Sequence, residues 1–343
     1  MIPSAEKPYG GIFVINQYNF LKKDKRIKQL DLFGIDRSFT KFIGSVLKYL
    51  KGFIKFTPYY FRKYDLIHVH YFYPFGLLAY FYKTIHPRTA VVTTIHGTDL
   101  TEHIISKRNR FIFSKAATCV DYLIAVGKDI GTEAEQKLKR KVDLILSAGV
   151  DTAVFFHIQG TPKKYDFVFA GSFIERKGLD ILLKGIKKSN LKNARFCFLG
   201  SGEFQNRIEQ LGKTFTLDLL VNLAQDRMRM VFNESKFIIL PSREEPFGLV
   251  ITEAMYCGTP AIVAPVGGLM EQVRDGYNGF VLKENTADEI SNTLLKAFNM
   301  DAESYRLMAQ HALESNKHHS LQLICEKHVE IYQELIARKK QPL

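Results

Sequence analysis

The chain has 343 residues, of which 46% are apolar and 24% charged, which is typical of a folded globular protein and long enough for two domains. No apolar run reaches the roughly 20 residues that a membrane-spanning helix needs, so the composition excludes the integral membrane class. The four scattered cysteines indicate buried thiols in a reducing compartment. We therefore expect a cytoplasmic protein.

Positive charge gathers in the first half of the chain. Residues 1–160 contain 24 lysines and arginines against 13 acidic residues, whereas residues 161–343 contain 24 against 22. Between Arg37 and Tyr64 there are seven basic residues and no acidic one. This asymmetry favours a polyanionic partner. We expect an anionic membrane surface, met by a peripheral protein on the inner face of the cell membrane, and no nucleic acid, because no recognition module for one is legible.

Strand patterns alternate with helical stretches along the whole chain. This alternation predicts two α/β domains with parallel sheets. The strands are predicted at residues 27–33, 65–70, 90–95, 121–126 and 142–146 in the first half, and at 166–170, 195–199, 236–240, 261–263 and 279–282 in the second.

One predicted helix in the first half is both apolar and basic. Two interpretations stay open: a helix packed on its sheet with solvated lysines, or a surface that lies against anionic lipid. Its apolar face comprises Phe39, Phe42, Ile43, Val46, Leu47, Leu50, Phe53 and Ile54, and its basic face comprises Lys41, Lys48, Lys51 and Lys55.

A polar stretch at residues 157–164 is the expected linker between the domains. We predict an N-terminal acceptor-binding domain over residues 1–160 and a C-terminal nucleotide-sugar-binding domain over 161–318. A last helix is predicted over 319–343.

The most informative segment is residues 242–254, which follows an apolar strand pattern. It places two carboxylates, Glu245 and Glu253, eight positions apart. If a helix begins near Phe247, then Glu245 lies in the loop outside the carboxyl end of a strand, where open α/β sheets bind ligands. The first N–H groups of that helix would be free for anionic or hydroxyl groups. Such a site suits a sugar that carries a phosphate.

Further landmarks stand in order around this segment. Together they resemble the retaining GT-B glycosyltransferases of glycosyltransferase family 4. The landmarks are Ala170-Gly171-Ser172, Arg176-Lys177-Gly178, Leu199-Gly200-Ser201-Gly202, Pro241-Ser242 before the E-x7-E segment, Gly258-Thr259-Pro260, Gly267-Gly268 with Glu271, and Asp275-Gly276-Tyr277-Asn278-Gly279.

The resemblance implies the GT-B fold, in which two Rossmann-like domains face each other across a cleft and the C-terminal helix crosses back to the N-terminal domain. It implies that Lys177 stabilises the departing diphosphate and that Glu245 binds hydroxyls of the donor sugar. Glu253 would bind the ribose of the nucleotide.

The remaining donor contacts implied by the resemblance come from loops and backbone. The family has an arginine where this chain has Ser172, so one phosphate contact is absent, and Arg176 is the candidate to replace it. The expected donor-binding residues are Gly10, Gly11, Gly171, Ser172, Arg176, Gly200, Gly202, and the backbone amides of Phe247, Gly248 and Leu249.

The first half resembles the family more loosely. His96 and Asp99, in a His-Gly-Thr-Asp sequence after a strand, are expected near the donor sugar and the acceptor, with His96 in a catalytic role. His70 is expected on the acceptor side, with His68 predicted to face the other side of its strand. The family opens with a full strand before its first glycine loop, so we expect either an upstream start or an N-terminal sheet that lacks this strand.

We therefore expect a retaining glycosyltransferase that uses a UDP- or GDP-sugar and a glycan or lipid-linked acceptor in the synthesis of a cell-surface polysaccharide such as lipopolysaccharide. No metal or other cofactor is expected, because the histidines lack ligand spacing and no D-x-D element is present. Two alternatives stay open. One is a non-catalytic, membrane-associated partner of a glycosyltransferase, and the other is a sugar-nucleotide epimerase or glycan phosphorylase on the same fold.

Overall fold

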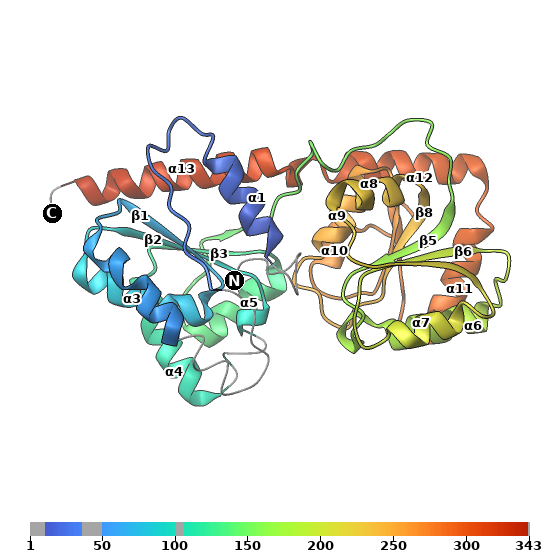
Figure 1. The fold of residues 1–343 in the computed structure, drawn as a ribbon, viewed down its shortest axis with the longest axis horizontal. Coiled ribbons are helices and arrows are strands. Elements are labelled where there is room, and N and C mark those ends of the chain that lie inside the picture. The colour runs from blue at the N-terminus through green and yellow to red at the C-terminus, as the bar shows by residue number, and fades with distance from the viewer. Residues whose placement is uncertain (1–10, 36–49, 101–103, 105, 342–343) are drawn as a thin grey trace. The chain divides into compact units, whose positions relative to one another are not determined.

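A computed structural model describes residues 11–35, 50–100, 104 and 106–341. The chain forms two compact units, shown in Figure 1. Unit 1 comprises Met1–Gly149 and Leu321–Leu343, and unit 2 comprises Val150–Ser320. The long last helix, α13 (Leu321–Lys340), thus belongs with the first half of the chain, as the GT-B resemblance implies.

The boundary between the units differs from the one expected after residue 160. Residues 150–160 belong to unit 2, because Val150 and Phe155 are buried in its hydrophobic core. The Ile158 N–H also donates to the Asn233 side-chain oxygen (2.7 Å). The segment expected as a linker is therefore attached to unit 2.

Unit 1 is a parallel sheet covered by helices on both faces. The sheet has the order β1-β2-β3-β4, and each neighbouring pair is parallel. Its elements are α1 (Ile12–Leu21), a helical stretch at 50–56, η1 (Thr57–Phe61), β1 (Leu66–His70), α3 (Phe72–Ile85), β2 (Ala90–Ile95), α4 (Lys107–Ala116), η3 (Ala117–Cys119), β3 (Tyr122–Ala125), α5 (Lys128–Leu138), β4 (Leu144–Ile145) and α13.

Strand β2 shows why two layers of helices are needed. Every residue of β2 is buried, and successive side chains point to opposite faces. Ala90 and Val92 pack with α1 and α13, whereas Val91 and Ile95 pack with residues of α3, α4 and α5. Figure 1 shows these two helical layers on either side of the sheet.

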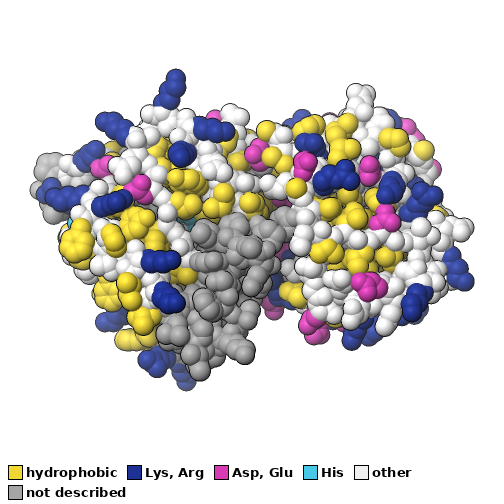
Figure 2. Space-filling model, viewed as in Figure 1, with side chains coloured by type: hydrophobic (Ala, Val, Ile, Leu, Met, Phe, Trp, Pro, Cys, Tyr) yellow, Lys and Arg dark blue, Asp and Glu magenta, His cyan; other side chains and the backbone are white. Residues whose placement is uncertain are grey.

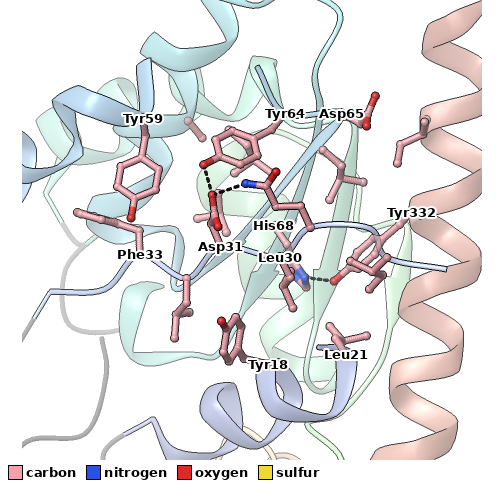
Figure 3. Close-up of a pocket in the computed structure, with 18 of the residues that line it drawn as sticks. Tyr18, Leu21, Leu30, Asp31, Phe33, Tyr59, Tyr64, Asp65, His68 and Tyr332 are labelled. Carbon is pink, nitrogen blue, oxygen red and sulfur yellow. Dashed lines mark hydrogen bonds between the residues drawn. The ribbon is translucent and has the colours of Figure 1, made fainter. Parts of the chain in front are cut away.

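The strand predicted at residues 27–33 is wrong. This segment forms no ladder, although it is partly buried and runs beside the sheet. It lines, together with the edge strand β1, a cavity of about 820 Å³ (Figure 3). In this cavity the Tyr64 hydroxyl donates to the Asp31 carboxylate (2.5 Å). The local pattern therefore favours an extended chain there, but the space between that chain and the sheet edge prevents pairing.

Unit 2 is a six-stranded parallel sheet in the order β10-β9-β8-β5-β6-β7. Its helices and strands are β5 (Tyr165–Ala170), η4 (Glu175–Lys177), α6 (Leu179–Ser189), β6 (Arg195–Leu199), α7 (Gln205–Leu211), β7 (Thr216–Leu220), α8 (Gln225–Asn233), β8 (Ser235–Leu240), α9 (Leu249–Tyr256), β9 (Ala261–Val263), α10 (Leu269–Gln272), β10 (Gly279–Val281), α11 (Ala287–Phe298), α12 (Ala302–Ser315) and η5 (Lys317–His319).

The five strands predicted in the second half are confirmed within a residue at each end. The sequence missed β7, which lies at the edge of the sheet and pairs only with β6. Its residues are half-buried or exposed, so their sequence lacks the continuous apolar run that marks the central strands.

The strand order positions the site. From the central strand β5 the chain moves outward through β6 and β7, then returns to β8 on the other side of β5 and moves outward through β9 and β10. The loops after β5 and β8 therefore leave neighbouring strands at the point where the order reverses. Ligands of open α/β sheets bind at such a point.

Candidate functional site

A cation and a carboxylate meet at the switch point of unit 2. Lys177 lies in η4, just beyond β5, and Glu245 lies in the loop between β8 and α9. The Lys177 Nζ donates to Glu245 Oε2 in an ion pair. Both side chains are largely buried, with 16% and 8% exposed. The structure thus brings together two of the predicted catalytic residues.

The Glu245 loop is held from several sides. The Ser242 hydroxyl donates to the Glu245 carboxylate (3.2 Å), and the Gly268 N–H donates to the Glu245 carbonyl (3.0 Å). Gly267 has φ 48°, and a Cβ there would lie 2.2 Å from the Glu245 carbonyl oxygen. Only glycine fits such an approach, which explains the first glycine of the Gly267-Gly268 pair.

The predicted glycine loops pack directly on one another. The Gly171 N–H donates to the Leu199 carbonyl (2.9 Å), and a Cβ on Gly200 would lie 1.9 Å from the Gly171 oxygen. A Cβ on Gly202 would lie 2.6 Å from the Phe173 oxygen. The loops after β5 and β6 therefore form one continuous rim, beside the turn that carries Lys177.

Ser172 and Arg176 lie on the same rim, between Gly171 and Lys177. Ser172 is exposed, whereas Arg176 is half-buried in η4. Whether Arg176 replaces the phosphate contact of the missing arginine stays a prediction.

The start of α9 forms the other wall. Gly248 takes the left-handed conformation (φ 85°) before the helix, and no side chain caps it. The opening bond of the turn runs from the Ile251 N–H to the Gly248 carbonyl (2.9 Å). The earlier amides, those of Phe247, Gly248 and Leu249, stand at a helix N-terminus, where N–H groups have no intrahelical acceptor.

The residue that fixes this turn, Gln272, was not among the predicted site residues. Gln272 is buried, and its Nε2 donates to the Phe247 carbonyl and to that of Gly268 (3.3 Å). Its Oε1 accepts from the Thr252 hydroxyl (2.5 Å). The available signal was a glutamine placed directly after the landmark Glu271.

Glu253 lies in α9 and is half-buried. Burial raises its pKa to about 8. Within the described part of the chain no hydrogen bond or ion pair reaches its carboxyl group. A buried carboxyl group with no partner favours a ligand whose hydroxyl groups can hydrogen-bond to it.

In unit 1 the predicted residues gather at the carboxyl ends of β1 and β2. His70 Nδ1 and His96 Nε2 share a hydrogen bond (3.1 Å), and the Phe13 ring of α1 packs on His96 (4.7 Å between centroids). Gly11 begins α1 with φ 81°. Burial lowers the pKa of His96 to about 3, so this imidazole is neutral at physiological pH. Gly10 lies outside the described residues.

The prediction that His68 and His70 face opposite sides is wrong. Their rings lie 4.2 Å apart, because residues two positions apart on a strand share a face. The two ring nitrogens of His68 are hydrogen-bonded to the hydroxyls of Tyr332 (2.5 Å) and Thr94 (2.8 Å). It therefore ties β1 to α13 and β2.

Asp99 is buried beneath the loop after β2. Its carboxylate accepts from the N–H groups of Phe72 (2.8 Å), Gly97 (2.9 Å) and His96 (3.2 Å). Burial outweighs these bonds and raises its pKa to about 6. Asp99 therefore shapes the loop that carries His96, and its contact with an acceptor stays a prediction.

The described residues contain no cluster of three or more His, Cys, Asp or Glu side chains able to hold a metal ion. They also contain no helix with the length and apolar character required to span a bilayer.

Two family sequence models match the chain. The model of Glycosyl transferases group 1 covers residues 131–315, more than half of the chain, and that of Glycosyltransferase Family 4 covers residues 24–154. The chain belongs to the glycosyl transferases group 1 family. An uncharacterized glycosyltransferase of Methanocaldococcus jannaschii is 30% identical to it over 277 residues, which make up 79% of this glycosyltransferase and 76% of the relative.

Solved structures share the fold of this glycosyltransferase. Sucrose-phosphate synthase of Thermosynechococcus elongatus superposes with a TM-score of 0.77 at 18% identity, over 98% of this chain and 96% of the other. Anabaena HepE, in complex with UDP and glucose, gives a TM-score of 0.70 at 19% identity, over 88% and 85%. The predicted GT-B fold, the family 4 resemblance and the transferase class are confirmed.

Proposed function

We propose that this glycosyltransferase moves a hexose-type sugar, with retention of its anomeric configuration, from a UDP- or GDP-sugar to a glycan or lipid-linked acceptor of a cell-surface polysaccharide such as lipopolysaccharide. The observation that carries the proposal is the Lys177–Glu245 pair at the switch point of unit 2. No other site in the described residues combines a buried cation with a carboxylate at the carboxyl ends of two central strands.

The two groups suit the two halves of an activated sugar. As the bond to the diphosphate breaks, negative charge grows on the leaving oxygen, and the Lys177 ammonium would stabilise it. The Glu245 carboxylate would accept hydrogen bonds from the sugar hydroxyls. The two groups form an ion pair with each other, and a bound donor would replace that ion pair with its own phosphate and hydroxyl oxygens.

The rest of the donor would lie along the rim. The half-buried Glu253 carboxyl would bind the ribose hydroxyls, and the amides at the start of α9 would bind the sugar and the diphosphate. Gly171, Gly200 and Gly202 would admit the nucleotide close to the backbone. Anabaena HepE, which shares the fold, is described in complex with UDP and glucose, and this supports a nucleotide-sugar donor.

The step itself would need no protein carboxylate as base. The departing phosphate would take the proton of the acceptor hydroxyl on the same face of the sugar, so the hydroxyl oxygen forms the new bond as the old one breaks. We also propose that the reaction is metal-independent, since Lys177 and the helix amides supply the positive charge. Addition of EDTA should then leave the rate within twofold, and a rate restored only by a divalent cation would overturn this point.

Unit 1 would meet an anionic membrane, where a lipid-linked acceptor resides. Figure 2 shows lysine and arginine side chains among hydrophobic ones on this unit. Apolar side chains are exposed on the helical stretch at 50–56 and on η1, with Ile54 63% and Phe61 85% exposed. Residues 39–49 of the predicted basic helix, with Lys41 and Lys48 of its basic face, lie outside the described residues. On the described part of that helix Leu50 and Ile54 are exposed, which supports contact with lipid, whereas Phe53 packs against the cluster of Phe56, Leu78 and Tyr82.

A thermal-shift panel tests the donor. UDP-glucose, UDP-N-acetylglucosamine and GDP-mannose are added in turn, and a selective donor should raise the unfolding temperature by mass action. The variants Lys177→Ala and Glu245→Ala should lose sugar transfer at least 100-fold while they keep a cooperative unfolding transition. Glu303→Ala, at an exposed position of α12, is the control. Full activity in either site variant, or no stabilisation by any donor, would overturn the proposal.

A further inference from the structure

Arg243 lies two positions before Glu245, and its contacts lead to the segment that carries Lys177. Its backbone N–H donates to the Arg176 carbonyl (2.8 Å). Its guanidinium donates to the Glu175 carbonyl (2.5 Å) and, through both Nη atoms, to the two oxygens of Asp180 (2.7 Å each). Arg243, in the β8–α9 loop, is thus hydrogen-bonded to η4 and to the first turn of α6.

The type of bond makes this link rigid. A guanidinium that binds a carboxylate through two parallel bonds fixes direction as well as distance, which a lysine ammonium does not do. The Asp180 side chain is 19% exposed and the Arg243 side chain 37% exposed. The Arg243 hydrogen bonds lower the pKa of Asp180, so this carboxylate stays charged over the physiological range.

The link does not use the groups proposed to bind the donor. The Lys177–Glu245 ion pair also joins the two loops. A donor that binds both groups would break that pair, because its phosphate and hydroxyl oxygens would take the place of each partner. The contacts of Arg243 would remain, since they involve the Asp180 carboxylate, a longer ion pair with the Glu175 carboxylate (4.0 Å) and backbone carbonyls.

We infer that Arg243 is a positioning residue, which holds the Lys177 turn against the Glu245 loop while the donor lies between them. This inference rests on the proposed roles of Lys177 and Glu245. Without the guanidinium, Lys177 would still bind the diphosphate, but its ammonium would be less closely aligned with the leaving oxygen. A displacement of about 1 Å in a positioned group can lower a rate about 100-fold.

The experiment measures kcat and KM for the donor that stabilises the protein in the thermal-shift panel, together with UDP affinity by calorimetry. Arg243→Ala and Asp180→Ala should each lower kcat about 10- to 100-fold, with KM and the UDP dissociation constant within threefold. Because both substitutions remove one link, the double variant should lose no more than Arg243→Ala alone. Arg243→Lys, which keeps the charge and loses the fork, should fall between Arg243→Ala and the unchanged enzyme.

Arg306→Ala is the matched control, because Arg306 makes a similar two-bond pair with Glu303 inside helix α12. It should change kcat less than twofold. If Arg243→Ala does not fold, Arg243→Lys and Asp180→Asn decide by the same criteria.

Two results would overturn the inference, and they are distinguishable. If Arg243→Ala keeps kcat within twofold while Lys177→Ala and Glu245→Ala lose activity, the positioning role is wrong and the proposed function stands. If Lys177→Ala and Glu245→Ala are themselves fully active, the proposed function is wrong as well.

Discussion

Lys177 and Glu245 are 68 positions apart in the chain, yet their charged groups form an ion pair at the carboxyl ends of two neighbouring strands. The pair is largely shielded from water, with its cation fixed in a short turn and its acid fixed in a loop. The residues that hold these two segments in place can be tested by substitution, as can Lys177 and Glu245 themselves.

The Gly267 position should be intolerant of any side chain. In Gly267→Ala the new methyl group would meet the Glu245 carbonyl at 2.2 Å, and the residue would keep a positive φ of 48°. We expect the free energy of unfolding to fall by about 2–4 kcal/mol and transfer activity to fall at least tenfold, as the Glu245 loop moves.

Gly276→Ala is the control for that substitution. Gly276 also has positive φ (70°), but nothing lies within 4 Å of the position of a new Cβ. Backbone strain alone should then cost about 1 kcal/mol and leave activity within twofold. Urea unfolding and donor turnover measure both effects, and equal losses in the two variants would show that contact with Glu245 is irrelevant.

Glu253 should make the protein less stable at alkaline pH. Its pKa is about 8 in the folded protein and near 4.5 when exposed, so between these values the folded state holds a proton that the unfolded state has released. The contribution of Glu253 to the free energy of unfolding is complete below pH 4.5 and is lost as pH rises through 8. The free energy of unfolding should fall by at most about 1.4 kcal/mol per pH unit in this range.

The measurement compares urea unfolding of the unchanged protein and of Glu253→Gln between pH 5.5 and 8.5. The variant should show a flatter decline, because a neutral amide has no proton to lose. Parallel curves for the two proteins would contradict the assignment. Glu271→Gln, at an exposed position of α10, serves as the comparison.

His328 should make the protein less stable at acidic pH, whereas Glu253 acts at alkaline pH. It is 3% exposed in α13, and burial lowers its pKa to about 4, against about 6.5 in an unfolded chain. The unfolded state therefore gains a proton first, and this part of the stability is complete above pH 6.5 and lost as pH falls toward 4. His328→Leu should narrow the difference in unfolding free energy between pH 7 and pH 4.5.

A substitution at the exposed His318 controls for histidine loss in general. His318→Leu should leave the pH dependence unchanged. If His328→Leu behaves in the same way, burial of that imidazole contributes nothing to acid sensitivity.

The exposed apolar residues of unit 1 should matter for lipid binding. The double variant Ile54→Ser and Phe61→Ser should reduce sedimentation with phosphatidylglycerol vesicles at least fivefold, because both side chains stand in solvent near a basic surface. Binding of the unchanged protein should weaken with added salt and be absent on phosphatidylcholine vesicles. Leu307→Ser, at an exposed position of unit 2, should bind vesicles like the unchanged protein. If the unchanged protein, the double variant and Leu307→Ser bind equally, Ile54 and Phe61 do not contribute to lipid binding.

Much of unit 2 could be predicted from the sequence because its information is local. Apolar runs marked five of the six strands, and the glycine and acid landmarks stood in the order of the family. Strand β7 was not predicted for a physical reason. Its side chains are exposed or half-buried at the edge of the sheet, so they need not be apolar, and Asp218 interrupts the apolar run of its sequence.

Unit 1 shows where local patterns fail. The segment at 27–33 has the residues of a strand, but a strand exists only if a partner's backbone lies within hydrogen-bonding reach. Here a cavity lies beside the edge of β1. Asp99 is the acidic residue of a family motif, and only the fold shows that its carboxylate already accepts hydrogen bonds from three backbone N–H groups.

The sequence by itself determined the class of fold, the succession of elements and the residue types of the donor site, because these follow from periodicity and from short motifs. Only the tertiary structure decided that Lys177 is paired with Glu245, that Gln272 fixes the start of α9 and that Arg243 joins two loops. Each of these contacts joins segments that lie at least 20 residues apart and meet only through the order of the parallel strands, a property that no short window of sequence contains.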